Sequence, residues 1–282
     1  MRKILHVSDV HFGRPHRPAA SAAVLELVAS RGPDLVVVAG DLTQRAKPRE
    51  FRQARRWVDA MAKPALAVPG NHDVPMYRFW ERLFVPFGAY RRHFDADLEP
   101  RFEDEELFAI GINSANNWTV KDGRVSPRQL RRVERALAAA PAGKTRIAVV
   151  HHELIPAPRF GSQKVLANAR PLVEILAAGG VELVLSGHLH QGYCALAESY
   201  YPGVGGAMLV VHSGTTSSDR GRGCEHGRNT GNWIEIAPDA LLVAHLEWHA
   251  GRGAFEERAV HHFPRSGRGA PRPGSGDARS GG

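Results

Sequence analysis

Short apolar runs that end in Asp, Asn or His recur along this 282-residue chain. The most constraining example is Gly70-Asn71-His72-Asp73, which follows the apolar segment 65–68 and Pro69. Gly-Asn is also a common turn signal, so this tetrapeptide predicts little by itself. Its weight comes from four further sets of polar residues, each of which follows a run typical of a buried strand. These sets are Asp9 and His11, then Asp41, then His151 and His152, and last His188 and His190.

The spacing of the apolar runs predicts a β-α-β-α-β order in the first part of the chain. Strands are expected at 4–7, 35–39 and 65–68, with helices at 19–29 and 48–61. This alternation is typical of an α/β fold with right-handed crossovers. Ligands in such sheets bind beyond the carboxyl ends of the strands. The candidate Asp, Asn and His residues all fall at those ends.

The rest of the chain continues the pattern. Strands are expected at 107–112, 146–150, 181–185, 208–212, 233–236 and 241–248, and helices at 127–139 and 169–178. Ser126 before Pro127 is typical of a helix N-cap with Pro at the first helical position. The aromatic-rich segment 74–90 predicts a short helical excursion over the site, and the sequence leaves open whether its rings pack or contact substrate. Residues 1–262 are expected to form one domain, and the Gly/Pro/Arg-rich residues 263–282 a disordered tail.

Composition excludes several classes of protein. No apolar run approaches the roughly 18 residues that a membrane span needs, so we expect no membrane association. The N-terminus begins like a signal peptide, but its apolar stretch is far too short, and we expect a cytoplasmic protein. The formal charge of +8 would suit a nucleic-acid partner, yet Arg is spread along the chain in the manner of a genomic base-composition bias. We therefore do not expect a nucleic-acid partner, although a positive field would help to attract an anionic substrate.

Two cysteines, Cys194 and Cys224, are too few for a disulfide framework and have no Cys-x-x-Cys partner. We expect both to be free thiols and expect no zinc–thiolate site. The histidines outside the five sets are expected at the surface or in packing: His6, His16, His93, His212, His226, His245, His249, His261 and His262. His212 is an exception to watch, because it precedes Ser213-Gly214 at a strand end and could face the cavity.

The candidate residues form a chemically coherent donor set of two Asp, one Asn and four or five His, without Cys. Oxygen and imidazole donors without thiolate suit Mn, Fe or Zn in a reactive site better than a structural zinc ion. A single ion cannot use seven protein ligands and stay reactive, whereas two ions that share a carboxylate can. Two-metal sites clamp the attacking and leaving oxygens of an in-line displacement.

The order Asp-x-His, Gly-Asp, Gly-Asn-His-Asp, His and Gly-His-x-His over residues 9–190 resembles the calcineurin-like metallophosphoesterase family. The resemblance implies a four-layer αββα sandwich, in which helices flank two mixed β-sheets. It also implies two divalent ions, the first held by Asp9, His11 and His190, the second by Asn71, His151 and His188, with Asp41 as the bridge. A hydroxide between the ions would be the nucleophile. His72 would donate a hydrogen bond to the phosphoryl or leaving-group oxygen.

Several roles stay open at this point. His151 matches the family position, which would leave His152 either behind the ligands as a supporting residue or on the substrate side, although Glu153 stands where many relatives have Pro. Asp73 could orient His72 or a nearby backbone, or cap the next turn. Arg220 and Arg222 lie in a Gly-rich loop that is either a contact for substrate phosphate or a solvated segment.

Within the family, the chain most resembles bacterial cyclic-nucleotide phosphodiesterase-like members. We therefore predict metal-dependent hydrolysis of a phosphodiester, with a 3',5'-cyclic nucleotide as one candidate. A phosphomonoesterase or phosphoprotein phosphatase is an alternative, and so is a DNA nuclease, although the chain has no room for an added DNA-facing domain. A non-catalytic scaffold on the same fold is a further alternative, against which the complete ligand set argues. The identity of the metals and a homodimer are left open.

Overall fold

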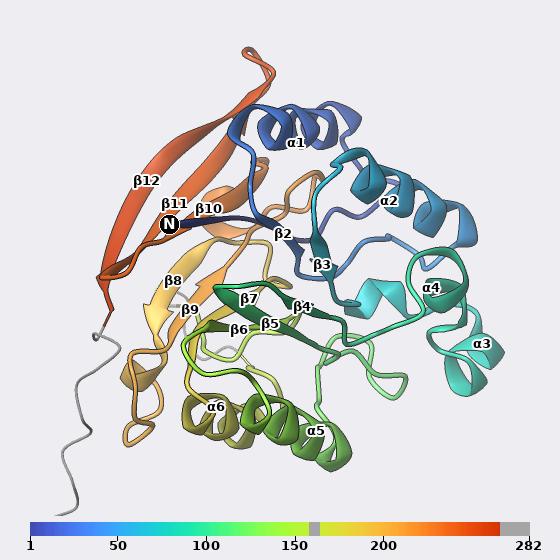
Figure 1. Ribbon diagram of the computed structural model, residues 1–282. Coiled ribbons are helices and arrows are strands. Elements are labelled where there is room, and N and C mark those ends of the chain that lie inside the picture. The colour runs from blue at the N-terminus through green and yellow to red at the C-terminus, as the bar shows by residue number, and fades with distance from the viewer. Residues whose placement is uncertain (158–163, 266–282) are drawn as a thin grey trace, which may run out of the picture.

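The computed structural model describes residues 1–157 and 164–265, which form two six-stranded mixed sheets with helices on their outer faces (Figure 1). The first sheet has the order β12-β11-β10-β1-β2-β3. Its strands are β1 (Arg2–Val7), β2 (Leu35–Val38), β3 (Ala65–Ala67), β10 (Thr230–Ile236), β11 (Ala240–His249) and β12 (Ala254–Pro264). β1, β2 and β3 run parallel, whereas β10, β11 and β12 are antiparallel to their neighbours.

The second sheet has the order β4-β5-β6-β7-β9-β8. Its strands are β4 (Arg101–Glu103), β5 (Leu107–Ile112), β6 (Thr145–Val150), β7 (Val181–Ser186), β8 (Tyr193–Leu196) and β9 (Leu209–His212). The central strands from β5 to β9 are parallel, and the two edge strands are antiparallel to them. Parallel strands of this kind are buried on both faces, which explains their continuous apolar sequences.

Three apolar clusters separate the layers. The cluster between the sheets contains Val37, Val149 and Val211. The outer face of the first sheet packs against α1 (Pro18–Arg31) and α2 (Pro48–Ala60), and that of the second against α5 (Pro127–Ala138) and α6 (Ala169–Ala178). Figure 1 shows the two helix pairs on opposite sides of the molecule. The predicted four-layer αββα sandwich is therefore confirmed.

Local sequence signals set the ends of the main helices. Pro18 stands at the start of α1, and Gly32 ends it in the left-handed conformation with φ 56°, as glycine allows. Ser126 caps α5 as predicted: its side chain accepts a hydrogen bond from the N–H of Gln129, whose side chain accepts one from the N–H of Ser126.

Edge strands and short helices are where the structure adds to the prediction. Sequence periodicity did not predict β4, β8 or β12, which are short or carry mostly exposed side chains. The excursion at 74–90 contains the short helices α3 (Phe79–Phe84) and α4 (Gly88–His93). β12 continues to Pro264, past the predicted start of the tail at 263, and residues 266–282 lie outside the described part of the chain.

Among the helices of the described residues, none has the length and apolar character needed to cross a bilayer.

Candidate metal centre

The seven predicted metal ligands all follow the carboxyl ends of strands, and they come from both sheets. Asp9 and His11 follow β1, Asp41 follows β2, and Asn71 lies in η1 (Asn71–Asp73), the 3₁₀ turn after β3. His151 follows β6, and the pair His188 and His190 follows β7. The face-to-face packing of the sheets brings these five loops to one place, so residues far apart in the sequence can share a ligand.

The backbone of this region has an unusual conformation. In residues 1–157 and 164–265, seven residues other than glycine have positive φ. Five of the seven are predicted ligands: Asp9, His11, Asp41, His188 and His190. Left-handed backbone is costly for such residues, and it persists only where the surroundings impose it, most often at functional sites. Two hydrogen bonds hold the first loop in place, from Asp9 N–H to Gly40 O (3.0 Å) and from His11 N–H to Asp41 O (3.0 Å).

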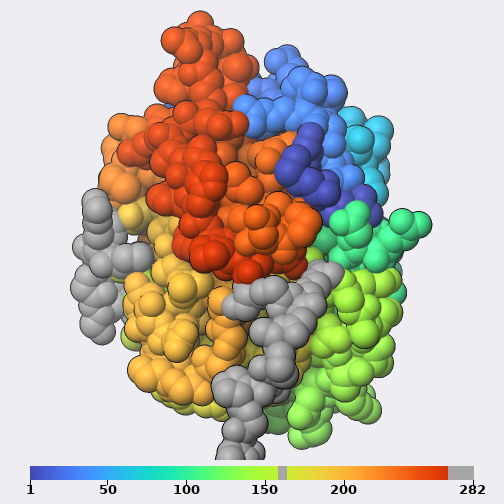
Figure 2. Space-filling model, turned by 60° about the vertical axis from the view of Figure 1, so that its left-hand side comes forward, coloured from blue at the N-terminus to red at the C-terminus, as the bar shows by residue number. Residues whose placement is uncertain are grey.

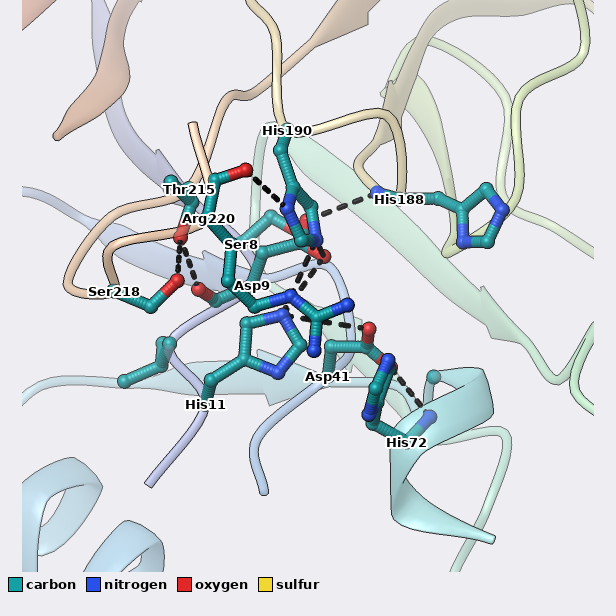
Figure 3. A network of polar contacts seen from close by, with 12 residues as sticks. Ser8, Asp9, His11, Asp41, His72, His188, His190, Thr215, Ser218 and Arg220 are labelled. Atoms are coloured by element: carbon teal, nitrogen blue, oxygen red, sulfur yellow. Dashed lines mark hydrogen bonds and ion pairs between the residues drawn. The ribbon is translucent and has the colours of Figure 1, made fainter. Parts of the chain in front are cut away.

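One group of donors consists of Asp9, His11, Asp41 and His190, which are all buried. His190 Nε2 lies 3.0 Å from Asp9 Oδ1 and 3.2 Å from His11 Nε2. His11 Nε2 lies 3.7 Å from both Asp9 Oδ1 and Asp41 Oδ2. Figure 3 shows these side chains converging from three loops. Their donor atoms therefore surround a common point.

A second group lies on the other side of Asp41. His151 Nε2 is 3.4 Å from Asp41 Oδ1 and 3.2 Å from Asn71 Oδ1. His188 Nδ1 is 3.0 Å from Asn71 Oδ1 and 3.3 Å from His151 Nε2. Asp41 thus directs Oδ2 at the first group and Oδ1 at the second, which is the arrangement that a bridging carboxylate requires.

Hydrogen bonds on the second ring nitrogen of two candidate ligands support the binding of cations at this place. His151 Nδ1 donates a hydrogen bond to Ala39 O (2.7 Å), and His190 Nδ1 donates one to Arg220 O (2.8 Å). A carbonyl partner on Nδ1 leaves the Nε2 lone pair free to bind a metal. Asp9 Oδ1 is buried 3.0 Å from His190 Nε2, and a cation bound between these two atoms would satisfy both. Oxygen and imidazole donors in these positions suit divalent Mn, Fe or Zn.

The protonation states of Asp9, Asp41 and His11 suit metal binding. Burial would raise the pKa of Asp9, but His190 and His11 hold it well below its usual range. The pKa of Asp41 is likewise lowered, because His151, His72 and His11 outweigh the effect of burial. Burial lowers the pKa of His11 to about 4. The two carboxylates are therefore ionised and His11 is neutral near pH 7, which are the forms that bind a cation. Burial would lower the pKa of His151, but Asp41 and Asp9 raise it above its usual value, so His151 must release a proton when an ion binds.

His72 and Arg220 lie beside the first group. The His72 ring is 4.9 Å from the His11 ring, centroid to centroid, and its Nδ1 lies 3.1 Å from Gln44 O. Arg220 Nη1 donates a hydrogen bond to Gln44 Oε1 (3.0 Å), and Asp41 and Asp9 attract its guanidinium. Figure 3 shows the Arg220 side chain extending toward His11 and Asp41.

Arg222 has a different position. Its side chain is exposed, and its backbone N–H donates a hydrogen bond to His190 O (3.2 Å). The sequence left open whether this Gly-rich loop contacts substrate phosphate or is solvated. In the structure, Arg220 lies next to the centre and Arg222 lies at the surface.

His152 and Asp73 have contacts that the sequence left open. His152 is close enough to His151 and His188 for the three to be a candidate metal cluster. Its two ring nitrogens, however, contact Ser114 Oγ (2.7 Å) and Lys121 O (3.1 Å). The Asp73 carboxylate accepts hydrogen bonds from the N–H groups of Leu42, Thr43 and Gly70. Asp73 thus fastens the loop after β2 to the loop after β3.

Several residues that are not candidate metal ligands hold the ligands in position, and the sequence analysis did not predict them. Gly70 packs against the backbone and carboxylate of Asp41, so any side chain there would collide with this residue, which lies between the two donor groups. Thr215 Oγ1 donates a hydrogen bond to Asp9 O (2.7 Å), and Thr216 Oγ1 accepts one from Ser8 N–H (3.1 Å). The glycine directly before each of Asp41, Asn71 and His188 was the available signal for close packing at these ligands.

His212 does not contact the centre in the way that its place in the sequence suggested. Its ring is buried and stacks on Tyr193, with 4.4 Å between centroids and 11° between planes. Neither ring nitrogen has a hydrogen-bond partner among the described residues. His212 is therefore a packed histidine of the second sheet.

Comparison with known proteins agrees with this geometry. The family model described as calcineurin-like phosphoesterase matches residues 2–192, which is well over half of the chain. The chain belongs to the calcineurin-like phosphoesterase family. It is a metallophosphoesterase with buried His and Asp clusters of the kind that bind metal ions.

Relatives within this family include two bacterial proteins. A probable cyclic nucleotide phosphodiesterase of Synechococcus is 31% identical over 178 residues, which cover 61% of this chain and 64% of that protein. The 3',5'-cyclic adenosine monophosphate phosphodiesterase CpdA of Escherichia coli K12 is 30% identical over 202 residues, covering 67% of this chain and 70% of that protein.

Among solved structures, a dimetal phosphatase of Danio rerio superimposes with a TM-score of 0.65. The superposition covers 94% of this chain and 99% of that chain at 11% sequence identity. This likeness concerns the fold alone.

Proposed function

We propose that the protein hydrolyses phosphodiesters with two divalent metal ions, and that a 3',5'-cyclic nucleotide is its candidate substrate. The observation that carries the proposal is the position of Asp41 between two groups of donors. Oδ2 lies 3.7 Å from His11 Nε2, and Oδ1 lies 3.4 Å from His151 Nε2. One carboxylate that faces two donor groups is expected where two ions act together, whereas a single structural ion would not need it.

The protein residues would divide the work as follows. Asp9, His11 and His190 would hold one ion and Asn71, His151 and His188 would hold the other, with Asp41 placed between the two groups. Bound divalent ions lower the pKa of a coordinated water and neutralise charge on phosphoryl oxygens.

His72 is suited to hydrogen bonding with the departing side of the ester. Its Nδ1 donates to Gln44 O, which fixes the orientation of the ring beside His11. When Nε2 also carries a proton, that N–H can donate to a phosphoryl or leaving-group oxygen. Arg220 offers further N–H groups to the same oxygens, because Gln44 occupies only one of its donors by a hydrogen bond from Nη1.

Preference for diesters is supported by the relatives. The Synechococcus and Escherichia coli proteins are both described as phosphodiesterases of cyclic nucleotides. A cyclic nucleotide carries one negative charge on its phosphodiester, which complements the cationic Arg220 and the ions. His152 would support His151 and His188 from behind, because its ring is buried and both ring nitrogens contact Ser114 and Lys121.

The test compares bis-p-nitrophenyl phosphate with the monoester p-nitrophenyl phosphate. Protein loaded with Mn²⁺ is assayed before and after chelation, alongside Asn71→Ala, His72→Ala and the control His93→Ala on α4. We expect metal-dependent cleavage that favours the diester. Asn71→Ala should lose bound metal and activity together, and His72→Ala should keep its metal but lose about 10²–10⁴-fold in kcat.

Two results would contradict the proposal. A preference for the monoester would favour a phosphomonoesterase or phosphoprotein phosphatase. Absence of both metal and activity in the wild-type protein would favour a non-catalytic scaffold. Once diester cleavage is established, cyclic AMP and cyclic GMP are the first natural substrates to assay.

A further inference from the structure

Three potential metal ligands meet at a second place, outside the candidate centre. Cys194 lies on β8, His245 on β11 and His261 on β12. One ligand atom of each lies within 4.8 Å of the other two, and Cys194 Sγ is 3.9 Å from His245 Nε2. None of these residues belongs to the ligand set of the candidate centre.

The strand register explains why these side chains converge. His245 is opposite Ala259, and Val243 is opposite His261, so the two histidines are diagonal neighbours on one face of the β11–β12 pair. Val243 packs in the cluster between the sheets, and Cys194 packs against the same cluster from the other sheet. The site therefore lies between the two sheets, close to their edge strands β12 and β8. Figure 2 shows the C-terminal strands, in red and orange, against the yellow-orange segment near residue 200 on this face of the molecule.

Asn232 orients His245, the more buried of the two imidazoles. His245 Nδ1 donates a hydrogen bond to Asn232 Oδ1 (2.6 Å), and Asn232 Nδ2 in turn donates to His212 O (3.1 Å). The arrangement leaves the lone pair of His245 Nε2 directed toward Cys194. A hydrogen bond of this kind on the second nitrogen is a regular feature of histidines that bind metals. Burial, with smaller contributions from His261 and Arg258, lowers the pKa of His245 to about 4, so the ring is neutral at pH 7.

We propose that Cys194, His245 and His261 bind a zinc ion that links the two sheets. One thiolate and two imidazoles are typical zinc donors, and water can take the fourth tetrahedral position beside the exposed His261. Adjacent donors around tetrahedral zinc lie about 3.3–3.6 Å apart, as follows from the usual Zn–N and Zn–S bond lengths. The Sγ–Nε2 distance of 3.9 Å is close to this value. His261 is exposed, so its side chain can turn to bring its donor atom, which lies within 4.8 Å of the other two, to the same spacing.

The thiol must lose its proton when the ion binds. Burial raises the pKa of Cys194 to about 11, so the free thiol is protonated at neutral pH. Zinc replaces that proton: the S–H bond breaks, a Zn–S bond forms, and one proton is released to solvent. Zinc affinity should therefore rise with pH.

Cobalt(II) provides a readout that separates this site from the candidate centre. A thiolate bound to cobalt gives a near-ultraviolet charge-transfer band, and the candidate centre contains no sulfur donor. The full-length protein is titrated with Co²⁺, and Zn²⁺ is then added in competition. We expect the band to reach the intensity of one thiolate-bound cobalt per chain once the candidate centre and this site are both filled, and to disappear with zinc.

Two matched pairs of variants assign the band. Cys194→Ser should abolish it, whereas Cys224→Ser should leave it unchanged. His261→Ala should weaken cobalt binding at least 10-fold, whereas His262→Ala, the next residue on the same strand, should not. A second readout uses the wild-type protein alone: zinc should protect Cys194, but not Cys224, from alkylation as measured by mass spectrometry.

The proposal is overturned if the wild-type protein shows no band, or if the band persists in Cys194→Ser. It is also overturned if zinc leaves Cys194 as reactive as before. None of these results depends on hydrolytic activity, so the proposed function stands or falls separately.

Discussion

Gly70 controls the candidate centre although it has no functional group of its own. A Cβ at this position would press on the backbone nitrogen and Oδ1 of Asp41. Gly70 has φ −103°, so the backbone conformation itself is open to any residue. The need for glycine is therefore steric, and it concerns the one carboxylate shared by both donor groups.

Gly70→Ala should displace Asp41 and weaken the centre. We expect a loss of about 10–100-fold in metal affinity or activity, the usual range for groups that position metal ligands. Gly251→Ala is the control, because a Cβ at Gly251 has no neighbour within 4 Å. Metal content and diester hydrolysis are measured for both variants. Equal behaviour of the two would show that Asp41 tolerates displacement.

At the scale of elements, the loop before α5 connects the centre to an exposed aromatic surface. Val120 O accepts a hydrogen bond from Asn71 Nδ2 (3.1 Å), and Lys121 O contacts His152 Nε2 (3.1 Å). Asn117 Nδ2 donates to Leu83 O, which ties the loop to α3. Trp118 on this loop and Trp80 on α3 are 80% and 71% exposed.

The sequence left open whether the aromatic rings of segment 74–90 pack against the protein or contact substrate. Tyr90 is buried in the core and packs with Phe51 and Phe94, whereas Tyr77, Phe79, Trp80 and Phe84 are exposed. The segment thus contains both a packed ring and rings that are available to a ligand.

Trp118→Ala should weaken binding of a nucleotide substrate more than it slows the chemistry. A ring stacked on a base is worth roughly 0.5–1.5 kcal/mol, so KM should rise about 2–10-fold with kcat nearly unchanged. Trp118→Phe, which keeps a ring, should retain most of the affinity. Steady-state kinetics with a cyclic nucleotide provide the measurement. An unchanged KM in the alanine variant would place the base elsewhere.

At the scale of the whole molecule, neutral histidines are buried in the packed layers. Burial lowers the pKa of both His6 and His212 to about 3. Repulsion from His245 lowers the pKa of His6 further, and repulsion from His6 lowers that of His212. In the unfolded chain a histidine has a pKa near 6.5. Between about pH 6.5 and pH 3 the unfolded state therefore binds more protons than the folded state, and stability falls as the pH falls.

His212→Phe should make the fold less sensitive to acid. Phe can stack on Tyr193 in the same place, and neither nitrogen of His212 has a hydrogen-bond partner among the described residues that would be lost. Between pH 7 and pH 5, one such histidine costs about 2 kcal/mol of unfolding free energy. Urea unfolding of chelated protein at the two pH values should show a smaller loss in the variant. Parallel losses would mean that His212 is protonated in the folded state.

The fold and most of the site's composition could be predicted because their signals are local. Continuous apolar runs marked the buried parallel strands, and Ser126 with Pro127 marked the start of α5. The Asp, Asn and His residues stand directly after those strands, so their place at one edge followed from the rule for carboxyl ends. The edge strands β8 and β12 carried no comparable signal, since an edge needs neither alternation nor a full apolar face.

The sequence by itself determined which seven residues would gather at the strand ends, because hydrophobic burial dictates where each strand stops. Only the tertiary structure decided that Asp41 faces both donor groups. It also decided which ring nitrogens of His151 and His190 are free to bind a metal, and that the ring nitrogens of His152 contact Ser114 and Lys121 instead. It also brought Cys194 beside His245 and His261, where no spacing motif predicted a thiolate site. Such arrangements depend on strand register and on packing between the two sheets, and these are properties of contacts between residues far apart in the chain.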